Sequence, residues 1–276
     1  MSKQVVAERI LRTMPGGTQS RLALCNDGIQ YVTKCPQNPQ GPNVLANEFI
    51  AARLMSAVGL PVPPSRAIRY NFDHKCVFEL NHQEVFEEPA CDLHFASELV
   101  MPTPGGRLYS FLPSSFISRI ENRDMFLGAF VFDIWAGSTD VRQAVYVENN
   151  DTKTFRVVFI DNGHLFGGPH WKFSLKAGTA ICLEKDVYAN LFNPEAIEAW
   201  IFQIETKVSE LLPDLIKTVP PQWYKGDIVR LQEILLSRAR LLRSLFWDEI
   251  ANLREPLRSS FRGIYETSHD PPVLPG

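Results

Sequence analysis

Residues 132–168 read FDIWAGSTDVRQAVYVENNDTKTFRVVFIDNGHLFGG, and this stretch decides the fold. Two runs within it, 144–148 and 155–160, are mainly apolar, β-branched or aromatic. They flank the sequence NND at 149–151, which is typical of a turn. We therefore expect two strands joined as a β-hairpin.

An aspartate lies at the outer end of each expected strand. Asp140 precedes the first strand and Asp161 follows the second. Because the outer ends of an antiparallel pair lie together, we expect both carboxylates in one small site. Protein kinases use such a pair, one Asp accepting the hydroxyl proton and another, followed nearby by Gly, binding Mg²⁺. The alternative is that both are ordinary turn residues.

The composition is that of a soluble globular protein with one large or two small domains. The 276 residues include 45% hydrophobic residues and carry a net charge of −3. This balance gives no electrostatic reason to expect a nucleic-acid partner. The basic residues Arg238, Arg240 and Arg243 fall on an expected helix, where a solvated face explains them.

The cysteines and the hydropathy pattern point to a cytoplasmic protein. The 5 cysteines are widely spaced and include no Cys-x-x-Cys pair, so neither a disulfide framework nor a zinc site is indicated. No segment approaches the roughly 18 apolar residues of a membrane span. We therefore expect no membrane association.

The N-terminal region contains a glycine loop followed by a hairpin and a lysine. The sequence PGGTQS at 15–20 ends an expected first strand, and 21–25 and 29–34 read as two strands around a turn. Backbone amides of such a loop can bind phosphate oxygens, and Lys34 can neutralise them. A plain turn and a surface lysine are the alternatives.

Residues 44–58 have the apolar spacing of a helix, with Leu45, Ala52 and Met55 on one side. Glu48 falls on the same stripe, where a carboxylate is costly without a partner. Lys34 is the natural partner, and the alternative is that Glu48 borders the stripe and reaches water.

The sequence PTPGG at 102–106 marks the expected boundary between two lobes. We expect a β-rich N-terminal lobe over 1–102, a helical C-terminal lobe over 103–265 and a flexible tail over 266–276. Helices are expected at 114–120, 123–135, 194–212 and 227–253. Asp133, within an almost wholly apolar helix, is expected to be a satisfied buried carboxylate or a brace for the following loop.

The order of these parts resembles the HipA family of serine/threonine kinase-like proteins over about residues 15–265. The resemblance rests on the following sequence features: Asn47-Glu48, GLPVP at 59–63, His94-Phe95, FDIW at 132–135, DVRQAV at 140–145, FIDNG at 159–163, Phe166 and Trp171. The two aspartate motifs are the most specific of these.

The resemblance implies an α+β, two-lobed protein-kinase-like fold that binds ATP and Mg²⁺. It implies Asp140 as the catalytic base and Arg142 as a second catalytic residue. It also implies Asp161 as a metal ligand, and Lys34 with Glu48 as the pair that orients the phosphates. The implied nucleotide-binding loop comprises Gly16, Gly17, Thr18, Gln19 and Ser20.

Two positions depart from the kinase pattern. Ser138 stands where the family often has Asn, and Val145 stands where ordinary kinases place a metal-binding Asn. Gln143 can substitute as a metal or phosphate contact, because an amide oxygen is a hard ligand. We therefore expect either a kinase that phosphorylates Ser or Thr in a protein substrate or in itself, or a nucleotide-binding pseudokinase read by a partner protein. A small-molecule kinase would use the same site.

Overall fold

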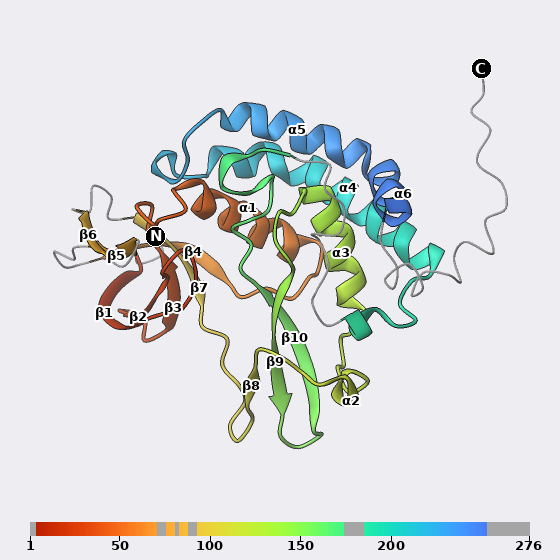
Figure 1. Cartoon of the computed structure of the whole chain (residues 1–276), viewed down its shortest axis with the longest axis horizontal. Coiled ribbons are helices and arrows are strands. Elements are labelled where there is room, and N and C mark those ends of the chain that lie inside the picture. The colour runs from red at the N-terminus through yellow and green to blue at the C-terminus, as the bar shows by residue number, and fades with distance from the viewer. Residues whose placement is uncertain (1–3, 71–75, 81–82, 88–92, 174–184, 253–276) are drawn as a thin grey trace.

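The computed structural model describes residues 4–70, 76–80, 83–87, 93–173 and 185–252, with backbone only for 76–80 and 83–87. The described chain has a strand-rich N-terminal part and a mainly helical C-terminal part (Figure 1). The tail expected at 266–276 lies outside the described residues.

The N-terminal part is a closed five-stranded barrel. Its strands in spatial order are β1 (Val6–Thr13), β2 (Arg21–Cys25), β3 (Gln30–Lys34), β7 (Leu93–Glu98) and β4 (Ser65–Tyr70). The first hairpin is confirmed, since β2 and β3 pair antiparallel around Gly28, whose φ is 78°. A separate hairpin joins β5 (Cys76–Leu80) to β6 (Gln83–Glu87).

Helix α1 (Asn43–Ala57) lies between the barrel and the C-terminal helices (Figure 1). Residues on nearly all of its sides are buried, including Glu48 and Asn47. The helix expected at 44–58 is therefore confirmed. Its burial extends well beyond one apolar stripe, because the barrel lies on one side of it and the C-terminal helices lie on the other.

The hairpin predicted from the opening stretch is confirmed. Strands β9 (Gln143–Asn149) and β10 (Thr154–Ile160) pair antiparallel, with Gln143 opposite Ile160. The short strand β8 (Leu108–Tyr109) extends the pair to three strands. Helix α3 (Met125–Ala136) ends just before the Asp140 loop, and all of its residues except Met125 are buried.

The other helices of the described chain pack mainly on α3, on α1 and on one another (Figure 1). They are α2 (Ser114–Ile117), η1 (Gly168–His170), η2 (Lys185–Tyr188), α4 (Pro194–Lys217), η3 (Pro221–Trp223), α5 (Ile228–Arg240) and α6 (Leu242–Asn252). The Asn193 side chain caps α4 by accepting hydrogen bonds from the Glu195 and Ala196 N–H groups, as favoured N-cap residues do.

Two helix predictions need correction. The helix expected at 114–120 ends at Ile117. The single helix expected at 227–253 is two helices that meet at the exposed Leu241. This break lets α6 bury Leu242, Phe246 and Ile250 in the main core, and Phe246 packs edge-on against Phe130 of α3.

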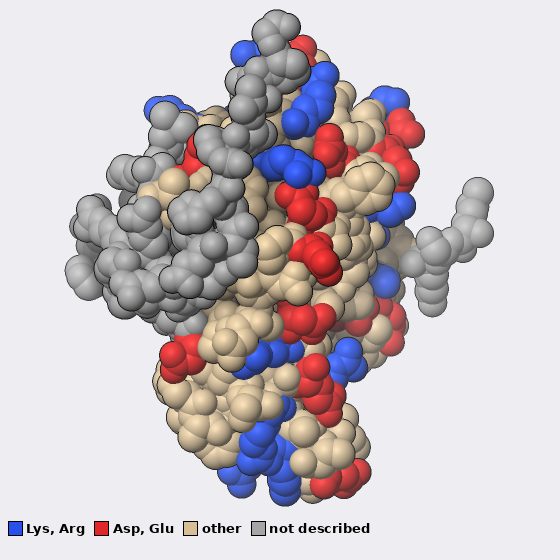
Figure 2. Space-filling model, turned by 90° about the vertical axis from the view of Figure 1, so that its right-hand side faces the viewer, with Lys and Arg blue, Asp and Glu red and all other residues tan. Residues whose placement is uncertain are grey.

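One large core joins α1 to the helices and hairpin of the C-terminal part, while the barrel has a small core of its own. Close packing of α3 on α4 depends on Gly128, where a Cβ atom would lie 2.5 Å from the Trp200 ring. On the coloured part of the face in Figure 2, Lys and Arg side chains are interspersed with Asp and Glu. Within the described residues, no helix combines the length and apolarity that crossing a bilayer requires.

Candidate active site

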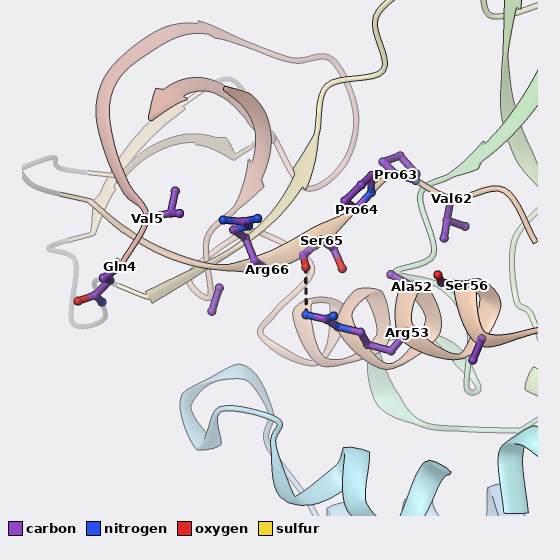
Figure 3. Close-up of a pocket in the computed structure, with 12 residues that line it drawn as sticks. Gln4, Val5, Ala52, Arg53, Ser56, Val62, Pro63, Pro64, Ser65 and Arg66 are labelled. Carbon is purple, nitrogen blue, oxygen red and sulfur yellow. Dashed lines mark hydrogen bonds between the residues drawn. The ribbon is translucent and has the colours of Figure 1, made fainter. Parts of the chain in front are cut away.

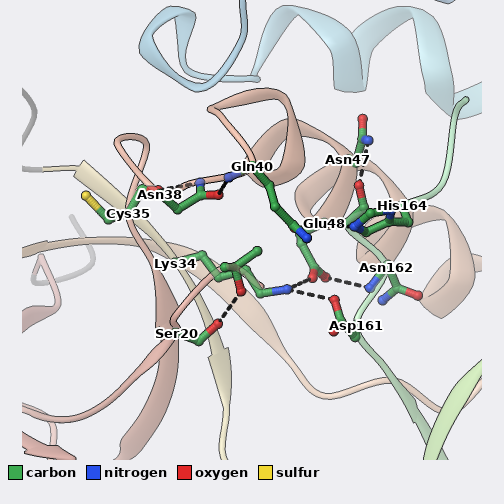
Figure 4. Close-up of polar contacts among 12 residues, drawn as sticks. Ser20, Lys34, Cys35, Asn38, Gln40, Asn47, Glu48, Asp161, Asn162 and His164 are labelled. Atoms are coloured by element: carbon green, nitrogen blue, oxygen red, sulfur yellow. Dashed lines mark hydrogen bonds and ion pairs between the residues drawn. The ribbon is translucent and has the colours of Figure 1, made fainter. Parts of the chain in front are cut away.

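Lys34, Glu48 and Asp161 form one ion-paired cluster (Figure 4). Lys34 Nζ, at the end of β3, donates to Glu48 Oε1 from α1 and to Asp161 Oδ1 at 2.9 Å. The Lys34–Glu48 pair predicted from the sequence is therefore present, and Glu48 does not reach water, being 4% exposed. The cluster joins two consecutive elements, β3 and α1, to the distant segment that follows β10.

The electrostatics of the cluster favour an ionised Lys34 and an ionised Asp161. Burial disfavours the charge on Lys34, but Glu48 and Asp161 outweigh it and raise its pKa above the ordinary value. Burial also acts against the Asp161 carboxylate, yet Lys34 holds its pKa below the ordinary range. Burial raises the pKa of Glu48, with Lys34 and the backbone N–H of Asn162 acting in the opposite direction.

A second network of buried hydrogen bonds connects to the cluster through Asn162. Arg142 Nε donates to Asp133 Oδ2 at 2.8 Å, and its Nη2 donates to Asp133 Oδ1. Arg142 Nη1 donates to Asn162 Oδ1 at 2.6 Å, and the Asn162 N–H donates to Glu48 Oε2 at 3.1 Å. Asp133 is thus a satisfied buried carboxylate that braces the following loop, as predicted. The guanidinium of Arg142 is buried rather than turned toward the solvent.

The Asp140 loop begins where α3 ends at Gly137, whose φ is 64°. The Asp140 carboxylate, which is half-buried, accepts a hydrogen bond from the Val141 N–H at 2.8 Å. Ser138 Oγ donates to the Asp140 carbonyl at 2.8 Å, so the loop is fixed from within. The Thr139 N–H donates to the His164 carbonyl at 3.0 Å, which places this loop beside the segment that follows Asp161.

Asn47 of α1 holds the segment after Asp161 in place. Its buried Nδ2 donates to the carbonyls of Gly163, Leu165 and Gly168 at 2.8, 2.9 and 3.2 Å, and its Oδ1 accepts from Trp171 Nε1 at 2.8 Å. Because the neighbouring Glu48 also binds this segment through Asn162, α1 and the Asp161 loop form one hydrogen-bonded unit.

The glycine loop between β1 and β2 is a tight turn. The Gln19 N–H donates to the Gly16 carbonyl at 3.0 Å, and the Met14 N–H donates to the Ser20 carbonyl at 2.7 Å. Gln19 has a φ of 47°, in the region that residues other than Gly seldom adopt. Thr18 and Ser20, which are buried, share a hydrogen bond between their hydroxyls.

A cavity of about 260 Å³ lies between this loop, the Lys34 cluster and the hairpin. Its polar lining includes Gly16, Thr18, Ser20, Lys34, Glu48, Gln143 and Asp161. Its apolar lining includes Val32, Phe95, Leu108, Val145 and Ile160. Gly17, Gln19, Asp140 and Arg142, which were also predicted as site residues, are not part of this lining. The cavity thus combines apolar walls with the ion-paired Lys34 cluster, and its lining also includes Glu98.

A larger and more open hollow of about 750 Å³ lies between α1 and the start of β4 (Figure 3). Arg53 of α1 donates across it to the Ser65 carbonyl at 3.1 Å. None of the predicted site residues lines this hollow, whereas seven of them line the smaller cavity: Gly16, Thr18, Ser20, Lys34, Glu48, Gln143 and Asp161.

Sequence reasoning missed three supporting residues. Asn162 links Arg142 to Glu48, and its position directly after Asp161 is the signal that could have pointed to it. Asn47 was noted only as part of a motif. Arg238 was expected on a solvated face, but it donates to the Trp135 and Ile134 carbonyls at 2.7 and 2.6 Å at the end of α3.

The chain is similar in structure to solved protein kinases. The proinflammatory kinase CtkA of Helicobacter pylori superposes with a TM-score of 0.55 at 13% identity, covering 90% of this chain and 98% of that chain. Golgi casein kinase with Mn/ADP bound gives a TM-score of 0.49 at 11% identity, covering 90% and 72%. The superposition on CtkA shows that the fold is that of a two-lobed protein kinase.

The sequence places the chain more narrowly within that class. The sequence model of the HipA-like kinase family matches residues 6–250, and the chain belongs to this family. The search of curated protein sequences found no match.

Proposed function

We propose that this HipA-like kinase transfers the γ-phosphate of ATP, with Mg²⁺, to a Ser or Thr hydroxyl of a protein substrate or of its own chain. The observation that carries the proposal is the buried Lys34–Glu48–Asp161 cluster at one end of a cavity bordered by the glycine loop. Phosphoryl transfer depends mainly on positioning and electrostatic stabilisation, which such a cluster supplies.

In this proposal the apolar end of the cavity takes the adenine, and the loop over 16–20 takes the phosphates together with Lys34. Asp161 and Gln143 supply carboxylate and amide oxygens, the hard ligands that Mg²⁺ prefers. Both residues line the cavity. Two protein ligands are enough for Mg²⁺, because this ion usually completes its coordination with waters and phosphate oxygens of the substrate. The metal would neutralise charge on the transferred phosphate.

Asp140 acts as the general base. The acceptor oxygen forms a new bond to the γ-phosphorus, the bond from that phosphorus to the bridging oxygen of ADP breaks, and the hydroxyl proton passes to Asp140. Arg142 acts as a positioning residue, since its contacts with Asp133 and Asn162 connect the Asp140 loop to the Asp161 loop.

A nucleotide-binding pseudokinase is the second candidate. The observation that favours it is Val145, which lines the cavity and has no metal-binding group where the kinase pattern expects an amide. On that account ATP would bind and stabilise the protein without transfer of its phosphate.

Transfer of ³²P from γ-labelled ATP tests the proposal. We expect transfer that requires Mg²⁺ and that falls by about 10² to 10⁴ in Asp140→Asn. Asp161→Asn, which removes a metal ligand, should abolish it. Circular dichroism should show that both variants remain folded. Undiminished transfer in either variant contradicts the residue assignment, and ATP binding without transfer in the wild-type protein supports the pseudokinase.

A further inference from the structure

The loop that connects β3 to α1, residues 35–42, has a fixed course. The buried Asn38 side chain donates from Nδ2 to the Cys35 and Gly41 carbonyls at 2.7 and 2.9 Å. Its Oδ1 accepts from the Gln40 N–H at 3.0 Å. Because one buried amide satisfies three backbone groups of this loop, the direction of the Gln40 side chain is set by the loop rather than by solvent.

Gln40 extends from this loop toward the cluster of Lys34, Glu48 and Asp161 (Figure 4). Its Oε1 lies 3.3 Å from His164 Nε2, in the segment after Asp161. Its Nε2 would lie 2.5 Å from a Cβ atom at Gly17. The Gln40 carboxamide therefore spans the space between the glycine loop and the Asp161 loop, and any residue larger than glycine at position 17 would displace it.

The charges of the Lys34 cluster explain why a neutral hydrogen-bond donor beside it can help to bind a phosphate. One ammonium and two carboxylates give Lys34, Glu48 and Asp161 a formal charge of −1, so the ligand-free cluster does not by itself attract a polyphosphate. A carboxamide offers two N–H donors without adding a negative charge. Gln40 can thus hold a phosphate oxygen and leave the ion pairs intact.

We propose that Gln40 is a nucleotide-binding residue whose Nε2 donates to the terminal phosphate of ATP and ties the glycine loop to it. The assignment rests on the proposed function and adds to it a residue that neither the sequence patterns nor the cavity lining indicate. With this role, the contribution of Gln40 to affinity depends on the number of phosphates in the nucleotide, because the contact is lost when the terminal phosphate is absent.

Calorimetric titration with ATP, ADP and AMP in the presence of Mg²⁺ tests this role. Gln40→Ala should weaken ATP binding by about tenfold or more, since hydrogen bonds to charged groups contribute about 1.5–3 kcal/mol. The affinity for AMP should be unchanged. Gln37→Ala is the matched control, because Gln37 lies in the same loop and its amide contacts the Cys35 thiol, away from the glycine loop.

A second variant tests the contact with the glycine loop. Gly17→Ala should also weaken ATP binding, because its methyl group displaces the Gln40 amide. In the Gln40→Ala background, Gly17→Ala should have much less effect, as expected of coupled residues. ATP affinity that Gln40→Ala leaves unchanged, or equal weakening of ATP and AMP, overturns the Gln40 assignment alone. A wild-type protein that binds none of the three nucleotides overturns the proposed function and this assignment together.

Discussion

Lys34 is the residue on which the geometry of the site depends, because its ammonium bridges α1 and the Asp161 loop. Its two partners come from positions 14 and 127 residues away in the chain. Local sequence therefore predicts the lysine and the glutamate but cannot establish their contact with Asp161. Asp161 adopts a φ of 57°, which Asn adopts at least as readily as Asp, so Asp161→Asn removes the charge with little backbone strain.

The pH dependence of stability should reveal the charge on Asp161. Its pKa is lower in the folded protein than in the unfolded chain, so the ionised carboxylate stabilises the fold above the unfolded pKa of about 3.9. That contribution disappears as the pH falls through the folded pKa. In urea unfolding from pH 7 to pH 3, the wild-type protein should lose its advantage over Asp161→Asn in the acid range. An advantage that increases on acidification would contradict this.

The buried Arg142–Asp133 pair should be costly to break. Removing one member leaves an uncompensated charge in the interior, with a typical cost of about 3–5 kcal/mol. We therefore expect Asp133→Ala to lower the free energy of unfolding by this amount, measured with urea. Glu233→Ala breaks the exposed Arg230–Glu233 pair and should cost less than about 1 kcal/mol. Similar values for the two variants would argue against a buried network.

At the scale of elements, the end of α3 determines where the Asp140 loop begins. Gly137 ends the helix, and Arg238 of α5 binds the Ile134 and Trp135 carbonyls with its guanidinium 5.1 Å from the Phe173 ring. These contacts bind two carbonyl groups of the last turn, a role suited to a cation at a helix C-terminus. Helix α5 thereby contacts the end of α3, just before the Asp140 loop, without contributing a residue to the cavity.

Arg238→Ala should loosen the Asp140 loop. We expect a loss of about 1–3 kcal/mol in unfolding free energy, because carbonyls lose hydrogen bonds from a charged donor. Phosphotransfer should slow as well. Arg240→Ala, at an exposed position of the same helix, should change stability by no more than about 0.5 kcal/mol. If both variants behave like the wild-type protein, Arg238 has no role in positioning the loop.

The sequence predicts elements well where periodicity and turn residues agree. The hairpin of β9 and β10 is the clearest case, since apolar runs and the NND turn lie within a few residues of each other. The break at Leu241 could not be predicted, because neither Gly nor Pro marks it. The break is favoured because it lets α6 pack against α3, and the residues that meet there are more than 100 positions apart in the sequence.

At the scale of the whole molecule, α1 connects the barrel to the helical part. Its Glu48 binds Lys34 of the barrel, and its Asn47 binds the Gly163–Gly168 segment. The same helix also belongs to the main apolar core. The two lobes and the Lys34–Glu48 pair were predicted from the sequence. The contacts of Asn47 were not, because hydrogen bonds to backbone carbonyls leave no pattern in the sequence.

Nucleotide binding should stabilise the entire protein because the cavity is formed by both parts. A ligand that binds only the folded state at 100 times its Kd adds about 2.7 kcal/mol. We expect Mg²⁺ and ATP together to raise the thermal midpoint clearly. The increase should be much smaller in Asp161→Asn, measured by differential scanning calorimetry. An equal increase in both proteins would locate nucleotide binding elsewhere.

The fate of the γ-phosphate tests the central claim most directly. The protein is incubated with Mg²⁺, ATP and a mixed library of Ser- and Thr-containing peptides, and mass spectrometry locates any added phosphate. We predict phosphate on a Ser or Thr of the protein or of a peptide, and none above background with Asp140→Asn. Wild-type protein that leaves all of the γ-phosphate on ATP, or equal transfer by Asp140→Asn, would contradict the account.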